Sequence, residues 1–546
     1  MDRLTTGGGP IRSGAVPSTI DPARPRWPFL EEGLLAAAVA ATLGAVCSVR
    51  YFPYQDATNN LARYVLMDRA WSGTPAPFLQ VRAIPTPYIA LDLVGVAMAH
   101  LLGPQLALRA MTVLLVCVIP LGTYLLLRAT CPERRGWALV AVLCSLSFYL
   151  MIGFFNFVAG IGAALIWLAA WWPRRDRTDS RTRIGLALGL AVVFFVHLAG
   201  AMSALVVVGV AYLLDAWARW RASGRRWPDA AALWTPRMTT LLSSTAAVAL
   251  CAGVWHLSLG PEPPVPHVPP DFRTLGNKLA NLASPFYALS YVQMRTMASG
   301  YALSLVAFLA VNRRTLRPDV MLWSAATFVA LFLVFPYRVD GAGFVDMRWL
   351  LPAILLPFCA TATGPVPRQR ALLAIPFLAV LAHAAVVHRA ATRFDAELTV
   401  YRQVLDAVPP TARLLPLIAE PQPQSRLSAF RHFALWHTID GGGRVPGLLT
   451  EEERYDTNPP SRPHKFFGHF REPVILYYPD ERWGTDRFFP LDWQRIATDY
   501  DYVIAVGADP RARAPLDGHA DKIDSAGDIA VYRVRGSTTP GARPAR

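Results

Sequence analysis

Runs of apolar residues long enough to cross a membrane recur along most of this chain, and they constrain its fold more than any other feature. The runs are roughly 17–20 residues long, and a transmembrane helix needs about 20 mostly apolar residues. About 11 such helices use about 220 of the 546 residues, which leaves room for long loops and one soluble domain. An ordinary soluble enzyme, a disordered tail protein and a disulfide scaffold are therefore excluded.

The apolar runs predict a polytopic α-helical membrane protein with about 11 transmembrane helices. The first run is too long for the apolar core of a typical signal peptide, so it is predicted to be a retained anchor. One long apolar block, 184–216, is divided into two spans at His197–Gly200. The predicted spans are 30–49, 105–127, 137–152, 157–172, 184–199, 201–216, 239–257, 297–311, 320–335, 349–363 and 370–388.

Segment 87–102 decides the predicted orientation of the chain. It is apolar but carries Asp92 and His100, which fall two turns apart on one helical face. If the segment lies on the outer surface or re-enters the membrane, the arginine-rich loops lie inside. Inside segments then hold more than twice as many basic residues as outside loops of similar total length. The positive-inside rule therefore predicts an inside N-terminus and an outside C-terminal domain.

The net charge of +15 is attributed to topology rather than to nucleic-acid binding. Only three of the 53 basic residues are lysines, and much of the arginine lies beside the spans. No basic run is interleaved with aromatic residues, so we expect no nucleic-acid partner. The six cysteines form no CxxC pair and five lie in apolar spans, which favours neither a structural zinc site nor a disulfide framework.

The composition divides the chain into four parts: a disordered cytoplasmic tail (1–27), a transmembrane domain (28–390), an extracytoplasmic α/β domain (391–535) and a second disordered tail (536–546). In the third part, short apolar runs predict strands and alternate with helical stretches, which is typical of a small α/β domain with a partly parallel sheet. The predicted strands are Leu414–Ile418, Val474–Tyr478, Tyr502–Val506 and Ile529–Val534, and the predicted helices are about 395–407, 427–438 and 491–498.

The long outer loops, 50–85, 258–296 and 337–348, contain most of the mixed-charge and aromatic sequence between the spans. In the first loop, Asp56, Asn60 and Arg63 fall on nearly one face if this stretch is helical. The carboxylate suits a general base or a metal ligand, and the guanidinium suits a phosphate. The alternative is a juxtamembrane helix that Asp56 caps, with Arg63 at the lipid headgroups.

A second cluster joins two late spans on the same face and contains Arg338, Asp340, Asp346 and Arg348. An arginine at the mouth of a span suits a phosphate leaving group. The alternative is an interfacial loop with a snorkelling arginine and an aromatic anchor. The stretch Pro261–Arg295 suits either a substrate lid or a plain connector.

Histidines give weaker signals. His197 lies near the outer end of a span, where ionisable groups are functional candidates, although a lone histidine is more often a packing residue. Four histidines of the C-terminal domain fall in two pairs, His432 with His437 and His464 with His469. Each pair is spaced i, i+5, which does not suit one helical face for zinc.

The chain resembles the GT-C superfamily of membrane glycosyltransferases. The resemblance rests on the many spans, on Asp56 in the first outer loop, and on Asp346-Met-Arg348-Trp-Leu-Leu-Pro352, which looks like a D-x-R-x-x-L-P entry to a late span. Segment 87–102 would match a juxtamembrane helix. The resemblance implies a multi-pass protein of the bacterial cell membrane. It would transfer a sugar from a polyprenyl-phosphate donor to an extracytoplasmic glycan, lipid or protein.

The resemblance also implies an inverting displacement on the outer face. Asp56 would deprotonate or orient the acceptor hydroxyl, with Asp346 as a second catalytic acid, and Arg348 with Arg63 or Arg338 would stabilise the departing phosphate. Asn59, Asn60, His197 and Asp340 would complete the substrate contacts. Many members carry a second acidic residue beside the first, whereas Asp56 is followed by Ala, Thr, Asn and Asn. A divalent metal bound through Asp56 therefore stays open.

Two other functions fit parts of the pattern. A transporter or lipid flippase would place charged or broken-helix sites near the bilayer midplane, whereas most spans here have clean centres. A non-catalytic envelope assembly protein would bind a partner through its soluble domain, and would tolerate replacement of Asp56 and Arg348.

Overall fold

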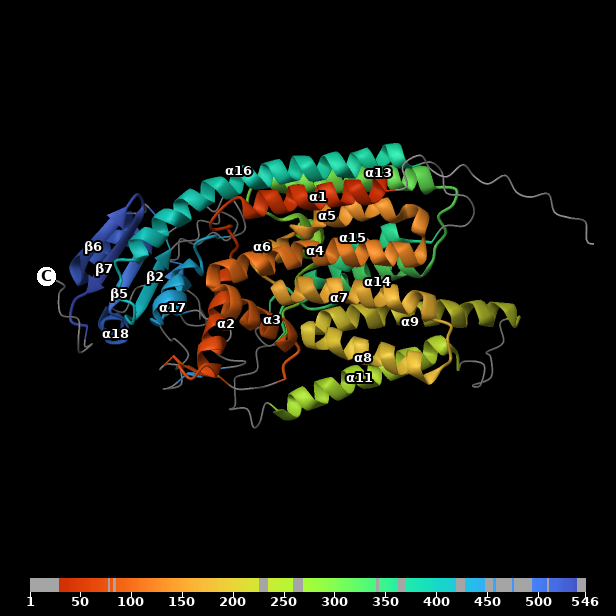
Figure 1. Ribbon diagram of the computed structural model, residues 1–546, viewed down its shortest axis with the longest axis horizontal. Coiled ribbons are helices and arrows are strands. Elements are labelled where there is room, and N and C mark those ends of the chain that lie inside the picture. The colour runs from red at the N-terminus through yellow and green to blue at the C-terminus, as the bar shows by residue number, and fades with distance from the viewer. Residues whose placement is uncertain are drawn as a thin grey trace, which may run out of the picture.

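The computed structural model shows a long helical bundle with a small sheet at one end (Figure 1). The longest helices run side by side along the length of this bundle. The two predicted tails, apart from residues 536–537, lie outside the described residues. The structure describes residues 29–76, 79–81, 85–224, 234–258, 269–339, 343–361, 369–418, 428–446, 455–457, 474–475, 493–507 and 510–537.

Every predicted span coincides with a helical segment. Eight segments within the described residues are long and apolar enough to cross a membrane, and three shorter apolar helices, 89–102, 320–334 and 347–359, accompany them. The chain is therefore a polytopic α-helical membrane protein, while the number of crossings and the orientation stay predictions. The bundle helices are α1 (Leu30–Cys47), α4 (Pro104–Thr130), α5 (Leu139–Ser145), α6 (Phe148–Ile152), α7 (Phe155–Trp171), α8 (Ser180–Val196), α9 (Leu198–Ala222), α11 (Pro236–Ser258), α13 (Tyr291–Asn312), α14 (Val320–Val334), α15 (Leu350–Leu355) and α16 (Ala374–Leu405).

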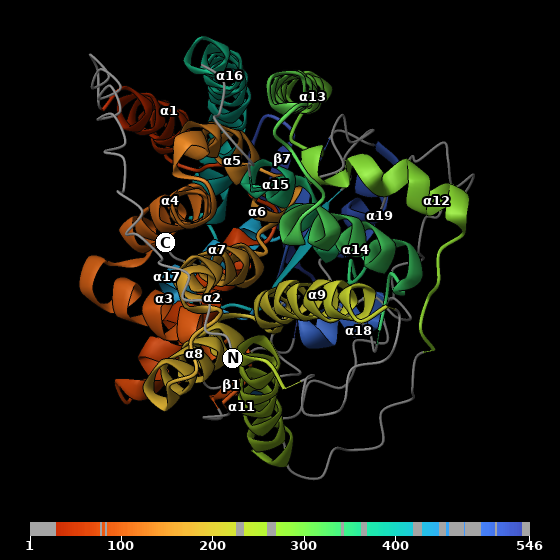
Figure 2. The ribbon, with the colours of Figure 1, turned by 90° about the vertical axis from the view of Figure 1, so that its right-hand side faces the viewer.

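The long apolar block is interrupted where the sequence predicts. His197 is extended, between the last residue of α8 and the first of α9, and its Nδ1 accepts a hydrogen bond from the Ala199 N–H at 3.0 Å. Seen end-on (Figure 2), α7 lies between α4 and α9. A Cβ on Gly200 would lie 2.3 Å from the Gly160 carbonyl oxygen. The α7–α9 contact therefore depends on glycine, as is common where membrane helices approach closely.

Two helices, α2 (Ala57–Trp71) and α3 (Ile89–Leu102), lie across the end of the bundle nearest the sheet (Figure 1). The 14 residues of α3 span about 21 Å, less than the roughly 30 Å hydrocarbon core. This length fits the predicted surface or re-entrant segment. Asp92 and His100 both face α2: Asp92 pairs with Arg63 and His100 with Asp68.

The C-terminal sheet has the strand order β4-β2-β5-β7-β6, with β2 parallel to β4 and β5, and β7 antiparallel to β5 and β6. The partly parallel sheet is therefore confirmed, as are three predicted strands with their bounds; of the fourth, only Val474–Ile475 is described. The strands are β2 (Leu414–Ile418), β4 (Val474–Ile475), β5 (Tyr502–Val506), β6 (Ala520–Ala526), which the sequence did not predict, and β7 (Ile529–Val534). A separate pair, β1 (Leu79–Val81) with β3 (Tyr455–Thr457), is antiparallel.

The helical stretch predicted over 395–407 is confirmed to residue 405, where it is the last part of α16 and not a helix of its own. Helix α16 is continuous over 32 residues and runs from the bundle to the sheet (Figure 1), because no glycine or proline interrupts the sequence after Pro376. The helix predicted over 427–438 is shorter and later: a 3-10 turn, η7 (Phe433–Leu435), leads into α17 (Trp436–Gly441). The last prediction matches α18 (Trp493–Asp499). Leu414, Ile504 and Val531 on one sheet face join the core of the bundle, while the other face packs on α18 and α19 (Pro510–His519).

The close α7–α9 contact gives a prediction. Gly200→Ala should destabilise the bundle by about 1–3 kcal/mol, because the added methyl group meets backbone and the helices must separate. Gly209→Ala on the same helix is the matched control, since a Cβ there meets nothing within 4 Å. Thermal unfolding of the purified protein in detergent measures both. Equal midpoints for the two variants would show that the contact is not tight.

Candidate active site at the sheet end of the bundle

Asp56 is held against the turn between α6 and α7. The Gln55 and Asp56 N–H groups donate to the carbonyls of Met151 and Ile152, each at 3.1 Å, and the Asn60 amide donates to the Gly153 carbonyl at 2.8 Å. Gly153 has φ +95, and a Cβ there would lie 2.8 Å from the Asp56 Cβ. Glycine is needed at this position for both reasons. Asp56 and Asn60 therefore face the same turn, as the helical pattern predicts.

The C-terminal part of the chain covers Asp56. His432 Nε2 lies 3.4 Å from Asp56 Oδ1, and the Ser428 N–H donates to the Gln55 side chain at 3.3 Å. The Tyr51 ring makes edge contacts with Phe433 and Trp436, at centroid distances of 5.3 and 5.7 Å. These contacts hold the segment 428–436 on the first outer loop.

Asp56 and His432 form a buried polar pair. Their side chains are only 10% and 1% exposed. Asp56 Oδ1 and His432 Nδ1 make no hydrogen bond to any described residue. Each buried atom that lacks a protein partner costs free energy, and such costs are typically tolerated where a site has a function.

Burial sets the protonation of this pair. Desolvation raises the pKa of Asp56 to about 6, while the Arg431 charge and a hydrogen bond from Gln55 act in the opposite direction. Desolvation lowers the pKa of His432 well below its usual value, and the nearby Arg431 charge adds to this effect. At neutral pH the site therefore holds a carboxylate beside a neutral imidazole. A carboxyl with a pKa near neutrality suits general-base catalysis.

Arg348 lies beside the residue that follows the same turn. Its guanidinium lies 5.5 Å from the ring of Phe154, the residue after Gly153, and it lies within electrostatic range of His197. His197 packs on Tyr88 and Phe157, at ring distances of 5.1 and 5.5 Å. Three predicted site residues, Asp56, Arg348 and His197, thus gather around one turn.

The other acid of the second cluster has a structural partner. Asp346 is buried and its Oδ2 accepts from Lys278 Nζ at 3.0 Å, and the same ammonium donates to the Phe332 and Phe335 carbonyls. Asp346 Oδ1 also accepts from the Met347 N–H. The geometry assigns Asp346 to the attachment of an outer loop, so its catalytic role gains no support here.

The remaining predicted residues are distributed as follows. Arg63 Nη2 donates to Asp92 Oδ1 of α3 at 2.6 Å, so the guanidinium is paired with a carboxylate. A contact between Arg63 and a phosphate stays a prediction. Asn59 is buried in α2. Arg338 is exposed, and its backbone pairs with Asp271. Asp340 lies outside the described residues.

The described residues contain no group of three His, Cys, Asp or Glu side chains placed to hold a metal, so a metal bound through Asp56 remains untested. His437 does not join His432, because its Nε2 lies 2.9 Å from the Ala412 carbonyl. The sequence reasoning considered His432 only as a metal ligand, and it did not consider Arg431 or Lys278 as site residues. No local pattern marks these residues, since each contact joins segments that are distant in the sequence.

No protein-family model matches the chain, and no curated protein sequence matches it. Among solved structures, the fold is similar to that of ArnT from Cupriavidus metallidurans in the apo state, with 14% identity, a TM-score of 0.48 and coverage of 93% of this chain and 98% of that one. The undecaprenyl phosphate-bound form of that protein gives a TM-score of 0.47, with 14% identity and coverage of 93% and 99%. The arabinofuranosyltransferase AftD from Mycobacteria gives 0.45, with 15% identity and coverage of 92% of this chain and 40% of that one.

The raised pKa of Asp56 predicts a stability effect. A carboxyl whose pKa is raised in the folded state makes the protein less stable as pH rises from about 4 through about 6, because the buried group then becomes charged. Asp56→Asn should therefore match the wild type at pH 4 and exceed its stability at pH 8, by at most about 3 kcal/mol for a shift of about two units. Thermal unfolding at both pH values measures the difference. A variant that is less stable than the wild type at pH 8 would contradict the predicted cost of the buried charge.

The Lys278–Asp346 pair gives a second prediction. Lys278→Met leaves a buried carboxylate without its cation and should cost about 3–5 kcal/mol, whereas Lys278→Met combined with Asp346→Asn should recover much of this loss. Arg393→Gln is the control, because its pair with Glu397 is exposed and contributes at most about 1 kcal/mol. Unfolding midpoints in detergent compare the three variants. A double variant no better than the single one would show that the pair is not coupled.

Proposed function

We propose that this protein is a membrane glycosyltransferase that moves a sugar from a polyprenyl-phosphate donor to an acceptor on the outer side of a cell membrane. The observation that carries the proposal is the buried Asp56 carboxyl, which has a pKa of about 6 and faces Arg431 at the end of the bundle that carries the soluble domain. Its place in the first outer loop agrees with the sequence resemblance described above.

Asp56 acts as the general base of the transfer. The acceptor hydroxyl attacks the anomeric carbon of the donor sugar and loses its proton to the carboxylate. The bond from that carbon to the phosphate oxygen breaks on the opposite side, so the sugar configuration inverts. His432 Nε2 lies 3.4 Å from Asp56 Oδ1 and orients the carboxylate. The imidazole also lies within reach of the proton that the carboxylate accepts.

Arg348 neutralises the departing lipid phosphate. Its guanidinium lies 5.5 Å from the ring of Phe154, next to the Gly153 turn that holds Asp56. A guanidinium suits this role because it stays charged and bonds two phosphate oxygens at once. His197, beside Arg348, lines the path of the donor, and the polyprenyl chain lies along the apolar helices. In this arrangement the N-terminus lies in the cytoplasm and the residues from 391 onward lie outside.

Transport and non-catalytic assembly are the alternatives to this function. A flippase needs polar groups along the membrane path, whereas the Arg63–Asp92 pair joins α2 to α3, which lie across the end of the bundle nearest the sheet, and Asp56 directly precedes α2. An assembly protein has no need for a buried carboxylate with a raised pKa.

Donor turnover by the purified protein tests the proposal. Asp56→Asn should lower the consumption of polyprenyl-phosphate sugars by about 10²–10⁴-fold, the usual contribution of a general base. The wild-type rate should rise with pH and reach half its maximum near pH 6, because only the carboxylate accepts a proton. Asp68→Asn on the same helix is the matched control, since Asp68 pairs with His100 away from the site.

The outcomes separate the three functions. Full turnover by Asp56→Asn would exclude Asp56 as the base. Absence of turnover by the wild type with a broad panel of donors, together with lipid movement in proteoliposomes, would favour the flippase. Absence of both activities would favour the assembly protein.

A further inference from the structure

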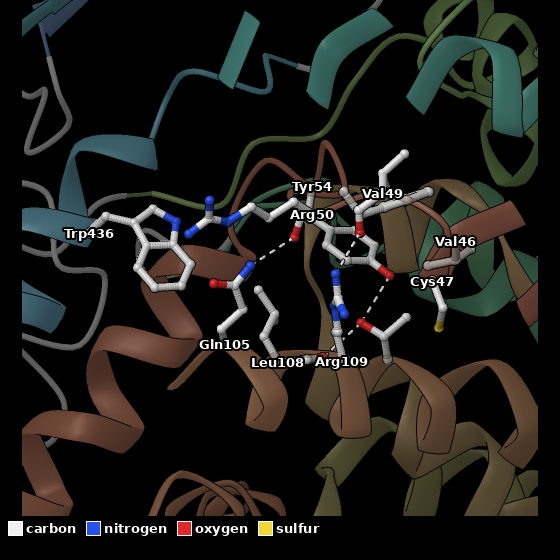
Figure 3. A pocket seen from close by; sticks show the side chains of 11 residues that line it. Val46, Cys47, Val49, Arg50, Tyr54, Gln105, Leu108, Arg109 and Trp436 are labelled. Carbon is white, nitrogen blue, oxygen red and sulfur yellow. Dashed lines mark hydrogen bonds between the residues drawn. The ribbon is translucent and has the colours of Figure 1, made fainter. Parts of the chain in front are cut away.

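The pocket between the ends of α1 and α4 has room for about one water molecule, because its volume is about 20 Å³ (Figure 3). Polar groups close it from within. The Gln105 amide donates to the Arg50 carbonyl at 3.3 Å, and Arg109 Nη2 donates to the Val49 carbonyl at 3.1 Å. This pocket therefore takes no larger ligand, and the surface of the molecule offers a stronger candidate.

Helix α12 (Leu275–Ala280) buries a lysine and exposes its leucines. Within α12, all of which the structure describes, the one buried residue is Lys278, at 3% exposure. Its ammonium is bonded to Asp346 and to two carbonyl groups at the end of α14. Leu275 and Leu279 are 62% and 52% exposed. A helix on a water-covered surface has the opposite arrangement, so these leucines need another apolar partner.

The exposed apolar side chains form one stripe along this segment. Leu275 and Leu279 are four residues apart and therefore lie on one helical face. Leu282, in the 3-10 turn η3 (Asn281–Phe286), continues the same spacing, and Phe272 precedes Leu275 by three residues. Both are exposed. We call Phe272, Leu275, Leu279 and Leu282 the α12 stripe.

Polar side chains lie on the other side of the same segment. Asn277 and Asn281 fall opposite the α12 stripe, and the Asn281 amide donates to the Asn277 carbonyl at 2.6 Å. The segment thus has three sides: a lysine toward the bundle, apolar side chains on one flank and amides on the other. This distribution is typical of a helix that lies in a membrane surface, with its apolar side among the lipids and its polar side in water.

The position of α12 fits a membrane surface. Helix α13, which follows it, is antiparallel to α16, because Gln293 lies beside His383 and Gly300 beside Ala379. The first turn of α13 is therefore nearer the sheet end. In the view along the bundle (Figure 2), α12 lies at the rim beside α14 and is seen from its side, whereas α13 is seen end-on. Helix α12 thus runs across the bundle axis, as a helix in the plane of a membrane does.

The surroundings of the α12 stripe favour lipid as its partner. The helices next to it, α13 and α14, expose apolar side chains of their own, among them Val292 and Val334. The stripe therefore continues an apolar surface that lipid already covers in a membrane protein. Arginines on tyrosine rings flank it: the Arg273 guanidinium lies 3.4 Å from the ring centre of Tyr337. Tyrosine and arginine are typical of the headgroup level, where arginine meets lipid phosphates.

We propose that the α12 stripe is embedded in the membrane surface at the sheet end of the bundle, among the first acyl groups of the lipids. The part 271–282 of the stretch Pro261–Arg295 is then a membrane anchor rather than a lid or a plain connector. The Lys278–Asp346 pair joins this anchor to the segment that precedes Arg348. The anchor therefore also fixes the height of that segment relative to the membrane surface.

Photo-crosslinking of the full-length protein in phospholipid vesicles tests the proposal. The photoreactive residue p-benzoylphenylalanine replaces Leu275, Leu279 or Asn277, one at a time, and mass spectrometry identifies what each probe bonds after illumination. Probes at Leu275 and Leu279 should bond acyl chains, whereas Asn277, the matched control on the polar side of the same helix, should lose this adduct. A probe at Val306, exposed within the α13 span, is the positive control. Thermal unfolding in detergent checks that each variant folds.

Each outcome supports or overturns the anchor. Lipid adducts at Leu275 and Leu279 without one at Asn277 support it. Bonds to a second copy of the chain, or to another of its segments, would overturn it in favour of a protein contact. Absence of lipid adducts at both leucines while Val306 is labelled would place the segment in water, and equal labelling of Asn277 would contradict an amphipathic orientation. Because no donor sugar enters the assay, failure of the transfer reaction leaves the result unaffected.

Discussion

The attachment of the first outer loop to the Gly153 turn is the constraint on which the site depends. Two backbone hydrogen bonds and the Asn60 amide fix the loop, and the glycine leaves room for Asp56 to approach the backbone. The next residue, Phe154, carries the contact with Arg348. One turn between two bundle helices therefore contacts Asp56 and, through Phe154, also Arg348. Because the helices are packed inside the bundle, this turn cannot shift independently of the core.

The buried charges described here differ in how closely they are paired. Arg63 lies 2.6 Å from Asp92 and Lys278 lies 3.0 Å from Asp346, and these pairs fasten α2 to α3 and the segment around Lys278 to the bundle. Asp56 and His432 are equally buried but lie 3.4 Å apart, and Asp56 Oδ1 and His432 Nδ1 make no hydrogen bond to any described residue. The close pairs stabilise the fold, whereas the looser pair keeps hydrogen-bonding capacity that a bound ligand would satisfy.

Sequence patterns predict the elements that local chemistry determines. The division at His197 follows from a polar residue in an apolar block, and β2, β5 and β7 follow from short continuous apolar runs. The predicted domain boundary between residues 390 and 391 falls inside α16, because a change of composition alone does not end a helix that lacks a breaker. Asp56 was found from its position in the chain. Its partner His432 was not, because that contact exists only once the C-terminal segment packs on the first loop.

The segment that carries His432 also controls the access of other molecules to Asp56. With its side chain only 10% exposed, Asp56 lies behind Ser428 and His432, and the rings of Phe433 and Trp436 hold this cover against Tyr51. In the proposed transfer, an acceptor as large as a sugar would reach the carboxylate only when this cover lifts. The frequency of that opening would then limit turnover, and the edge contacts of Tyr51 would act as its latch. Weakening the Tyr51 ring contacts would then speed the entry of the acceptor, and it would also admit water, which competes as an acceptor.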